Sequence, residues 1–471
     1  MPRPVPVHWQ LMRSGTFAAE LGTTDVIRLP SASEGSINIL MNAQMPGRGG
    51  HLIAGGKALG RTGGRLTRLF AGPIERILAR IDAGLEHGSL LAHFPGGMTR
   101  VLGGRGEGPA AEVIVHDWRA VLRLVTSGSV GCYQSYEALE WDSADPVQLF
   151  TLFVRNAASL GDTARAKGLW RAGARLLHAL RRNSRSRAAR NIAAHYDLGN
   201  DFYALWLDPT MSYSAACWSG LPEGAALEEA QRRKIDLMAD RLALRAGDQV
   251  LEIGCGWGFT ARRIAERHGA SVTAISLSEP QLAWARAQNG ADALPGLEYR
   301  RQDYRDVTGM FDAVISTEMV EAVGRAWWPA YLDRIAQVLK PGGRAALQYI
   351  AIRDDLFEAY AASADFIQTY IFPGGMLLSV SEFRCLAEER GLEWQDQVDF
   401  AEDYARTLRR WREAFDHAVE GGRLPSGFDA RFVRLWRFYL MYCEAGFSGG
   451  GITVSQVTLF KRPSPPHATG R

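Results

Sequence analysis

Cysteine is scarce and scattered in this sequence. The chain has 471 residues, and its five cysteines are Cys132, Cys217, Cys255, Cys385 and Cys443. No two of them form a CxxC pair, and none has a histidine partner at the spacing of metal ligands. The pattern therefore excludes a zinc site built on these residues and indicates a reducing compartment.

Long apolar runs are also missing. No stretch approaches the roughly 20 residues needed to span a bilayer, and the N-terminus, MPRPVPVHWQ, lacks the apolar segment of a secretory signal. The net charge is only +3, and 46% of the residues are hydrophobic, which is ordinary globular composition. We therefore expect a cytoplasmic protein whose contact with a membrane, if it has one, is peripheral.

Composition and periodicity divide the chain into five predicted regions. Residues 1–60 are rich in Pro, Gly, Ser and Asn, which predicts a loosely ordered segment. Residues 61–155 read as a small mixed domain, with helical spacing at 74–85 and an alternating strand at 111–117 before a helix-like stretch. A linker at 156–190, a larger domain at 191–462 and a tail at 463–471 complete the prediction.

The linker is strongly basic. Between Gly161 and Arg190 it carries nine Lys and Arg residues against one acid, Asp162, and leucines and Trp170 alternate with the arginines. Most charge runs are solvated faces, but this mixture favours an amphipathic segment on anionic lipid. Arginines also attract nucleic acid, but nothing else in the chain indicates a nucleic-acid-binding fold, so no nucleic-acid partner is expected.

From about residue 191 strands alternate with helices. Strands are predicted in DQVLEIGCGWG, ASVTAISLS, LEYRRQDYRD, FDAVISTEM and GRAALQYIAI, and helices in FTARRIAERHG, EPQLAWARAQ and WWPAYLDRIAQVLKPGG. This order is typical of an α/β fold with a doubly wound, mostly parallel sheet and helices on both of its faces.

A glycine-rich turn follows the first of these strands. Gly254, Gly256 and Gly258 lie between a buried strand and a helix, where glycine lets the backbone approach a ligand and the helix N-terminus offers free amides. A dinucleotide fingerprint places its third glycine one residue later and ends its second strand with an acid. Here that strand ends in Ser276-Leu277-Ser278, so the pattern favours S-adenosylmethionine (SAM) over a nicotinamide cofactor.

Several motifs together resemble the cyclopropane fatty acid synthase family. They run in the family order from about residue 190 to 460: HYDLGNDFYALWLDPTMSYSAACW, AQRRK, LEIGCGWG, SLSEPQ, QDYRD, FPGG and YLMYCEAGF. A weaker match, GSVGCYQSYEALEW at 128–141, resembles the N-terminal lipid-binding domain of longer bacterial members. The resemblance implies a Rossmann-like class I methyltransferase domain and a smaller N-terminal α+β lipid-binding domain.

The family resemblance also implies a reaction. A methyl group passes from SAM to a cis double bond in an acyl chain of an unsaturated phospholipid, and a carbocation results. Aromatic faces stabilise such a cation, and a base then removes one proton. Loss of the proton from the new methyl gives a cyclopropane, and loss from elsewhere gives a methyl-branched or methylene-branched product.

In this family the base is a bicarbonate held by a polar cluster. Glu321 in STEMVEAVG, Tyr404 in DYARTL and Ile350, through its backbone amide, match that cluster. Two positions depart, because Gln348 replaces the usual histidine and Ala215 replaces the usual cysteine. Gln348 can hydrogen-bond an anion but cannot carry a proton, so ring formation and branching both stay open.

The resemblance further assigns cofactor contacts and one cysteine. The positions that match residues around SAM, beside the three glycines, are Tyr213, Ser214, Glu252, Ser276, Ser278, Gln281, Gln302 and Tyr304. Ordinary structural or surface roles are the alternatives for these side chains. Cys443 matches a family active-site cysteine, but we favour a buried structural thiol because no base lies near it in the sequence.

Other features keep two interpretations. The aromatic segment FIQTYIFPGG at 366–375, with Trp327 and Trp328, either lines an acyl-chain tunnel or packs in the core, and His195 is either structural or catalytic. Relatives often form homodimers, and the sequence leaves the oligomeric state open. The rival functions are N- or O-methylation of a small molecule and non-catalytic lipid binding.

Overall fold

The computed structural model describes residues 48, 71–161, 198–290, 294–363 and 365–463, all of which lie within the unit Pro46–Arg471. The predictions for the N-terminal segment, most of the basic linker, His195 and the C-terminal tail lie outside the described residues. Among the described residues, no helix combines the length and the apolarity needed to cross a bilayer.

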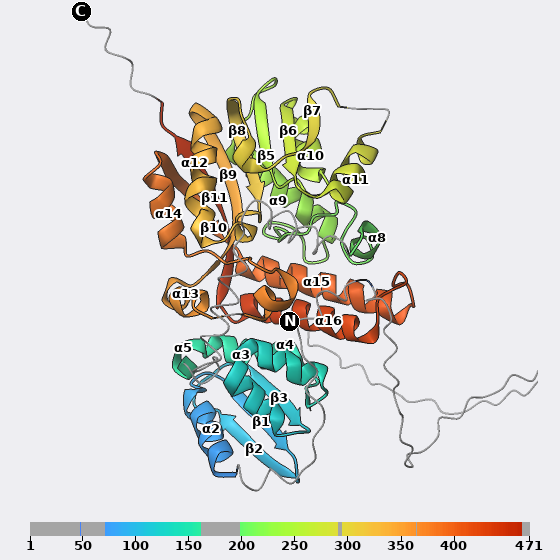
Figure 1. Cartoon of the computed structure of the whole chain (residues 1–471), viewed down its shortest axis with the longest axis vertical. Helices are drawn as coiled ribbons and strands as arrows, with labels where there is room; N and C mark the ends of the chain where they lie inside the picture. Colours follow the sequence, from blue (N-terminus) through green and yellow to red (C-terminus); the bar gives the residue numbers. More distant parts are fainter. Residues whose placement is uncertain (1–47, 49–70, 162–197, 291–293, 364, 464–471) are drawn as a thin grey trace, which may run out of the picture. The chain divides into compact units, whose positions relative to one another are not determined.

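The larger sheet has seven strands in the order β10-β11-β9-β8-β5-β6-β7 (Figure 1). The five strands β5, β6, β7, β8 and β9 pair in parallel with their neighbours. Strands β11 and β10 extend the sheet beyond β9 by antiparallel pairing. The bounds are β5 Gln249–Ile253, β6 Ser271–Ser276, β7 Leu297–Arg301, β8 Phe311–Thr317, β9 Leu339–Ile352, β10 Leu392–Asp399 and β11 Ile452–Lys461. The predicted doubly wound, mostly parallel α/β fold is confirmed.

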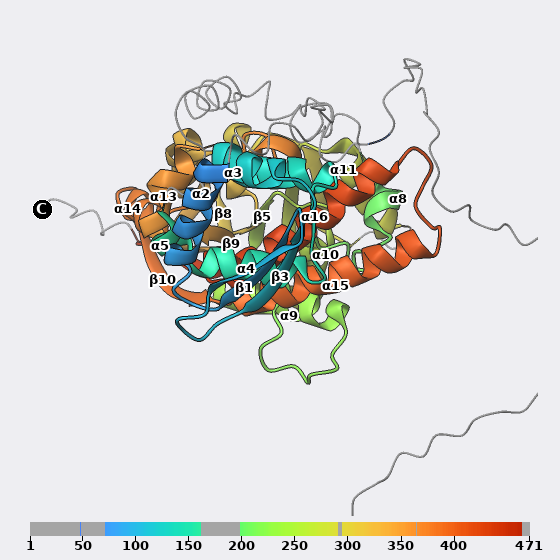
Figure 2. The ribbon, with the colours of Figure 1, turned by 90° about the horizontal axis from the view of Figure 1, so that it is seen from below.

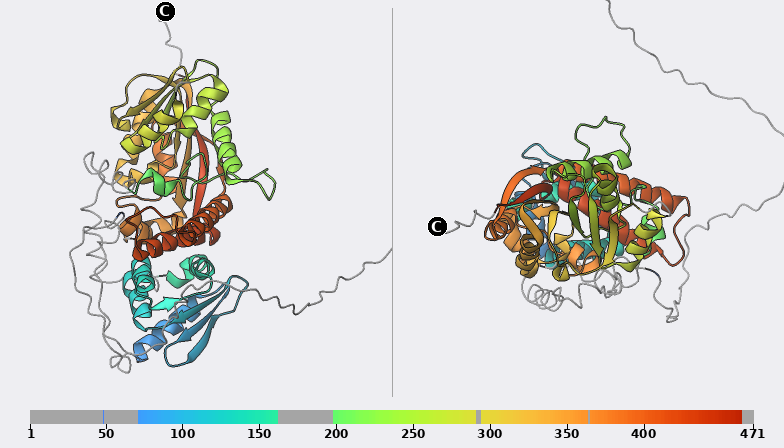
Figure 3. Two further views of the ribbon diagram at one scale, coloured as in Figure 1. Left: turned by 90° about the vertical axis from the view of Figure 1, so that its right-hand side faces the viewer. Right: turned by 90° about the horizontal axis from the view of Figure 1, so that it is seen from above.

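Helices cover both sides of this sheet (Figure 3). Helix α9 packs against α10, and α12 packs against α14. The bounds are α8 Asn200–Tyr203, α9 Leu227–Arg241, α10 Phe259–His268, α11 Glu279–Asn289, α12 Trp328–Val338, α13 Asp354–Ala361 and α14 Val380–Glu388.

Two predicted elements end earlier than expected. Helix α12 ends at Val338 and the chain continues directly into β9, because Pro341 and Gly342, with a φ of +81°, cannot continue a helix. The strand expected to run through LEYRRQDYRD ends at Arg301. A short 3₁₀ turn follows, Tyr304–Asp306, in which the Arg305 amide donates to the Asp303 side chain.

A smaller sheet of order β2-β1-β3-β4 forms the N-terminal α+β domain. Strands β1 and β2 are antiparallel, and β1 and β3 are parallel. The bounds are α2 Ala71–Gly84, β1 Ser89–Phe94, β2 Met98–Gly103, β3 Ala110–Val115, α3 Arg119–Glu137, β4 Trp141–Asp142, α4 Pro146–Arg155 and α5 Ala157–Leu160. Figure 2 shows this sheet in front of α4 when the molecule is seen from below.

Two long helices, α15 (Ala401–Glu420) and α16 (Ala430–Ser448), join the two sheets. They lie between the larger sheet and the helices α3 and α4 (Figures 1 and 3), and α16 packs on both α4 and α3. Aromatic rings fill this junction: Tyr133 of α3 lies 5.1 Å from Phe366 and 5.3 Å from Phe438, measured between ring centroids. The apolar junction indicates that the two parts fold as one body.

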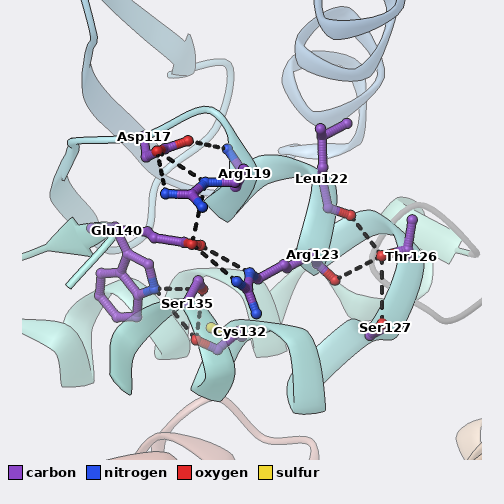
Figure 4. A network of polar contacts seen from close by, with 10 residues as sticks. Asp117, Arg119, Leu122, Arg123, Thr126, Ser127, Cys132, Ser135 and Glu140 are labelled. Carbon is purple, nitrogen blue, oxygen red and sulfur yellow. Dashed lines mark hydrogen bonds and ion pairs between the residues drawn. The ribbon is translucent and has the colours of Figure 1, made fainter. Parts of the chain in front are cut away.

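A buried ionic cluster organises the smaller domain (Figure 4). The Glu140 side chain is 3% exposed and lies 3.0 Å from Arg123 and 3.6 Å from Arg119, both in the first half of α3. Arg119 also binds Asp117, which precedes the helix. Glu140 therefore holds the start of α3 against the residues that lead into β4.

Replacing Glu140 with alanine is expected to lower the free energy of unfolding by about 3 kcal/mol, because Arg123, whose side chain is only 13% exposed, is left without this counter-charge. Urea unfolding of the full chain measures this loss. Glu112→Ala is the matched control, since that side chain is 50% exposed and pairs with the partly exposed His93. The control is expected to cost less than about 1 kcal/mol, and equal losses would contradict the role of Glu140.

Candidate functional site

A cavity of about 550 Å³ lies at the carboxyl ends of the parallel strands. At one end it is lined by the loop between β5 and α10 and by residues that follow β6, β7 and β8. At the other end it is lined by Ser127, Gly128 and Ser129 of α3, by Val154 and by Ala157. A single cavity therefore connects the predicted cofactor loop with the smaller domain.

Most of the predicted cofactor residues line this cavity. They are Tyr213, Ser214, Glu252, Gly254, Gly256, Ser276, Gln281, Gln302 and Tyr304. Gly258 and Ser278 do not line it. Gly258 begins α10 and packs against Tyr299, whose hydroxyl donates to the Gly258 carbonyl at 2.9 Å, and Ser278 is buried at the start of α11. Both residues precede a helix, Gly258 before α10 and Ser278 before α11, so they form the turns into these helices.

The glycine loop leaves room for a ligand. Gly254 and Gly256 have φ values of +85° and +52°, which glycine adopts at little cost. A Cβ atom built on Gly254 would lie 2.7 Å from the Met319 side chain. A Cβ atom on Gly256 would meet no atom within 4 Å, although Gly256 lines the cavity. The missing side chain of Gly256 therefore keeps part of the cavity open.

Unpartnered polar atoms mark the same end of the cavity. Gln281 Nε2 and Glu252 Oε2 are buried without a hydrogen-bond partner. Burial raises the pKa of Glu252 to about 8. An amide donor and a carboxyl oxygen without partners suit SAM, because a cationic sulfonium or ammonium nearby would favour the ionised form of Glu252 and adenosine accepts hydrogen bonds. The residues present fit this cofactor.

The predicted anion-binding residues come together, but around a side chain that the sequence analysis did not select. Glu318 is the first residue after β8. Its Oε1 accepts hydrogen bonds from the Ala215 amide at 2.9 Å and from Gln348 Nε2 at 2.8 Å, and its Oε2 accepts one from the Tyr404 hydroxyl at 2.8 Å. Three of the donors expected to bind bicarbonate therefore bind Glu318, and these residues do not fit bicarbonate at this position.

Glu321 is close to this cluster but has a different partner. Its Oε1 accepts a hydrogen bond from the Ile350 amide, and its Oε2 is buried without a partner. Burial and the neighbouring Glu318 charge raise the pKa of Glu321 to about 8. Glu321 is therefore mostly protonated at neutral pH.

Lys234 supplies the positive charge of the site. It is 1% exposed, and its Nζ donates to the Ser214 hydroxyl at 2.6 Å. Burial lowers its pKa to about 8, while the nearby carboxylates, Glu318 first, act in the opposite direction. The AQRRK motif contained this lysine, but nothing in its helical surroundings predicted that it would be buried beside carboxylates.

Part of the aromatic segment at 366–375 lines the cavity, and part of it packs in the core. Ile367 and Phe372 line the cavity, whereas Phe366 and Tyr370 are buried in the core at 0% and 2% exposure. Trp328 is fully buried in the core, and Trp327 is not among the lining residues. A role in an acyl-chain tunnel therefore stays a prediction, and only for the residues that line the cavity.

Cys443 lies on α16 and lines the cavity. Burial raises the pKa of its thiol far above the ordinary value, so the thiol stays protonated and is a poor nucleophile. Cys443→Ala is therefore expected to keep the rate of methyl transfer within about threefold of the wild-type rate. Cys217→Ala, at a buried cysteine that does not line the cavity, controls for effects on folding. A loss of catalysis confined to Cys443→Ala would contradict this expectation.

Two relatives with described activities are similar to most of this chain. A tuberculostearic acid methyltransferase from Mycobacterium tuberculosis, UfaA1, is 38% identical over 379 residues, which cover 76% of this chain and 84% of that protein. The cyclopropane-fatty-acyl-phospholipid synthase of Escherichia coli K12 is 33% identical over 345 residues, covering 72% and 84%.

Solved structures give the same grouping. The cyclopropane synthase MmaA2 from Mycobacterium tuberculosis superposes with a TM-score of 0.54 and 29% identity, covering 58% of this chain and 98% of that one. The mycolic acid cyclopropane synthase CmaA1, complexed with SAH and CTAB, gives a TM-score of 0.54, 28% identity and the same coverage. The family model described as mycolic acid cyclopropane synthetase matches residues 183–457. The chain belongs to this family of SAM-dependent methyltransferases.

Proposed function

We propose that this enzyme methylates a carbon of a cis double bond in the acyl chain of a phospholipid and releases a branched, still unsaturated chain. The observation that carries the proposal is the continuous cavity, which begins at the glycine loop and ends among apolar and small residues of α3, α5 and α16. An alkene is a weak nucleophile, so it needs an electrophilic methyl group aimed at it in a site that excludes water. An acyl chain in this cavity meets that need.

When bound, SAM supplies the methyl group, and the electrons of the broken carbon–sulfur bond leave with the sulfur. The chain's own residues manage the charge that appears on the acyl chain. Tyr213, Phe372 and Tyr439 line the cavity, and the rings of Tyr213 and Tyr439 each lie 6.4 Å from that of Phe372. The hydroxyls of Tyr213 and Tyr439 are 2.7 Å apart, which fixes the two rings. These aromatic faces stabilise a carbocation by cation–π attraction.

The branched product is favoured over a ring by two arguments. Gln348 and Ala215 depart from the cyclopropane-forming pattern. The relative named tuberculostearic acid methyltransferase is also more similar to this chain, at 38% identity, than the cyclopropane synthase is, at 33%, with 84% of each relative covered. Saturation of the branch would require a hydride donor, so a separate reductase must act if a saturated chain is made.

The lipid must reach the cavity from a membrane surface. The basic, leucine-containing segment at 161–190 has the composition of a peripheral membrane anchor, and the smaller domain lies at the far end of the cavity. We therefore place the enzyme in the cytoplasm, on the inner face of the membrane.

The experiment is mass spectrometry after incubation of the enzyme with SAM carrying a CD₃ methyl and liposomes of monounsaturated phospholipid. A labelled lipid that takes up hydrogen on catalytic reduction would support the branched alkene. A labelled lipid that keeps two deuteriums and resists mild hydrogenation would mean a cyclopropane. No label in lipid, with SAM binding intact, would point to a small-molecule acceptor.

A further inference from the structure

Glu318 occupies an unusual backbone position. It is a non-glycine residue with a φ of +48°, at the turn between β8 and the following 3₁₀ turn, Val320–Ala322. Side chains rarely adopt this left-handed conformation, which costs about 1 kcal/mol. The Glu318 amide donates to the Gln348 carbonyl at 2.7 Å, so the neighbouring strand β9 maintains the turn. Strain that is maintained at a cavity wall indicates a functional constraint.

The carboxylate of Glu318 is held by groups that are themselves fixed. Gln348 Oε1 accepts a hydrogen bond from Gln456 at 3.0 Å, which leaves the Gln348 amide NH₂ facing Glu318. The Tyr404 ring packs on Phe447 at 4.4 Å between centroids. The ionised form of Glu318 accepts from all three donors at once, whereas a proton on either oxygen would compete with one of them. The donors therefore favour the carboxylate over the neutral acid.

Two carboxyl groups line this wall, and only one is suited to accept a proton. Glu321 is bound to one amide, and its charged form is disfavoured by burial beside Glu318. Burial also raises the pKa of Glu318, but its three donors and the attraction of Lys234 oppose that rise, whereas the Glu318 charge adds to the rise at Glu321. A proton next to a carbocation is strongly acidic, so a weak base that is already ionised is sufficient to remove it.

We infer that Glu318 is the base of this reaction, so that a side chain of the protein replaces the bound bicarbonate that the family resemblance implied. The inference rests on the proposed function. A Glu318 oxygen takes a proton from a carbon beside the cationic centre. The electron pair of the broken C–H bond stays on the chain and forms the new double bond, and the proton passes to water when the product leaves. Tyr404 and Gln348 are positioning residues that hold the carboxylate.

The test compares the wild type with Glu318→Gln and Glu318→Gly in buffer freed of carbon dioxide, with and without added bicarbonate. Methylated lipid, SAH release and SAM binding are each measured. Wild-type turnover is expected to be independent of bicarbonate. Glu318→Gln is expected to lower kcat by about 100-fold or more, with SAM affinity changed less than about threefold. Glu298→Gln, on an exposed side chain of β7, is the matched control and is expected to keep wild-type activity.

Glu318→Gly makes the test sharper because glycine suits the φ of +48° and frees all three donors. Its activity is expected to be low without bicarbonate and to rise about tenfold or more when bicarbonate is added. Tyr404→Phe is expected to lower kcat about tenfold and to shift the acidic limb of its pH profile upward, because one donor to the carboxylate is lost.

The outcomes separate the inference from the proposed function. Wild-type enzyme that binds SAM but labels no lipid would refute the proposed function. Wild-type enzyme that labels lipid only when bicarbonate is present would overturn the role of Glu318, as would full activity of Glu318→Gln.

Discussion

Replacing Gly256 with leucine is expected to weaken SAM binding by about 100-fold or more, while the fold persists. A Cβ atom at this position meets no protein atom within 4 Å, so the ligand-free protein can accommodate the first side-chain atom. The same atom projects from the glycine loop that lines the cavity, where the cofactor is expected to bind. The substitution therefore acts on the ligand, apart from a backbone cost of about 1–2 kcal/mol for a side chain at a φ of +52°.

Isothermal titration of SAM and thermal unfolding measure the two effects separately. Gly391→Leu is the matched control, because Gly391 has a φ of +71°, has open space at its Cβ position and does not line the cavity. The two variants are expected to lose similar stability, and only Gly256→Leu is expected to lose SAM affinity. Retained affinity in Gly256→Leu would place the cofactor elsewhere in the cavity.

The parallel strands of the sheet could be predicted from the sequence because each is encoded by a local pattern of residues. Each of β5, β6 and β8 is a short, mainly apolar run followed by a turn, and the glycine loop predicts the crossover from β5 through α10 to β6. The antiparallel strand β11 is different. It pairs with β9 and β10 across two long helices, α15 and α16, so no local pattern reveals its place in the sheet.

The arrangement of the glutamates in the site could not be predicted from the sequence. STEMVEAVG contains two glutamates three residues apart, and the resemblance selected Glu321. Which of them meets Ala215, Gln348 and Tyr404 depends on the left-handed turn at Glu318, which residue propensities disfavour for glutamate. The only available signal was that Glu318 directly follows a strand of an open parallel sheet, where ligands bind.

Replacing Glu252 with glutamine is expected to make the ligand-free protein relatively more stable as pH rises. The folded-state pKa of Glu252 is about 8, above the ordinary 4.5, because the side chain is buried at the end of β5. Between these values the folded state binds more protons than the unfolded state. Stability from this group is therefore complete below about pH 4.5 and is lost as pH rises through 8, by up to about 1.4 kcal/mol per pH unit.

Glutamine keeps the shape of the protonated acid and does not titrate. Between pH 5.5 and 7.5 the free energy of unfolding of Glu252→Gln, relative to wild type, is expected to increase by about 2 kcal/mol. Urea unfolding at several pH values measures the difference, with Glu298→Gln on the exposed side of β7 as the control. Glu321 has the same upward shift and stays in both proteins, so it cancels in the comparison. Lys234, with its pKa lowered to about 8, begins to titrate only at the upper end of this range. A pH-independent difference between Glu252→Gln and wild type would mean that Glu252 is ionised in the folded protein, with Lys234 as its counter-charge.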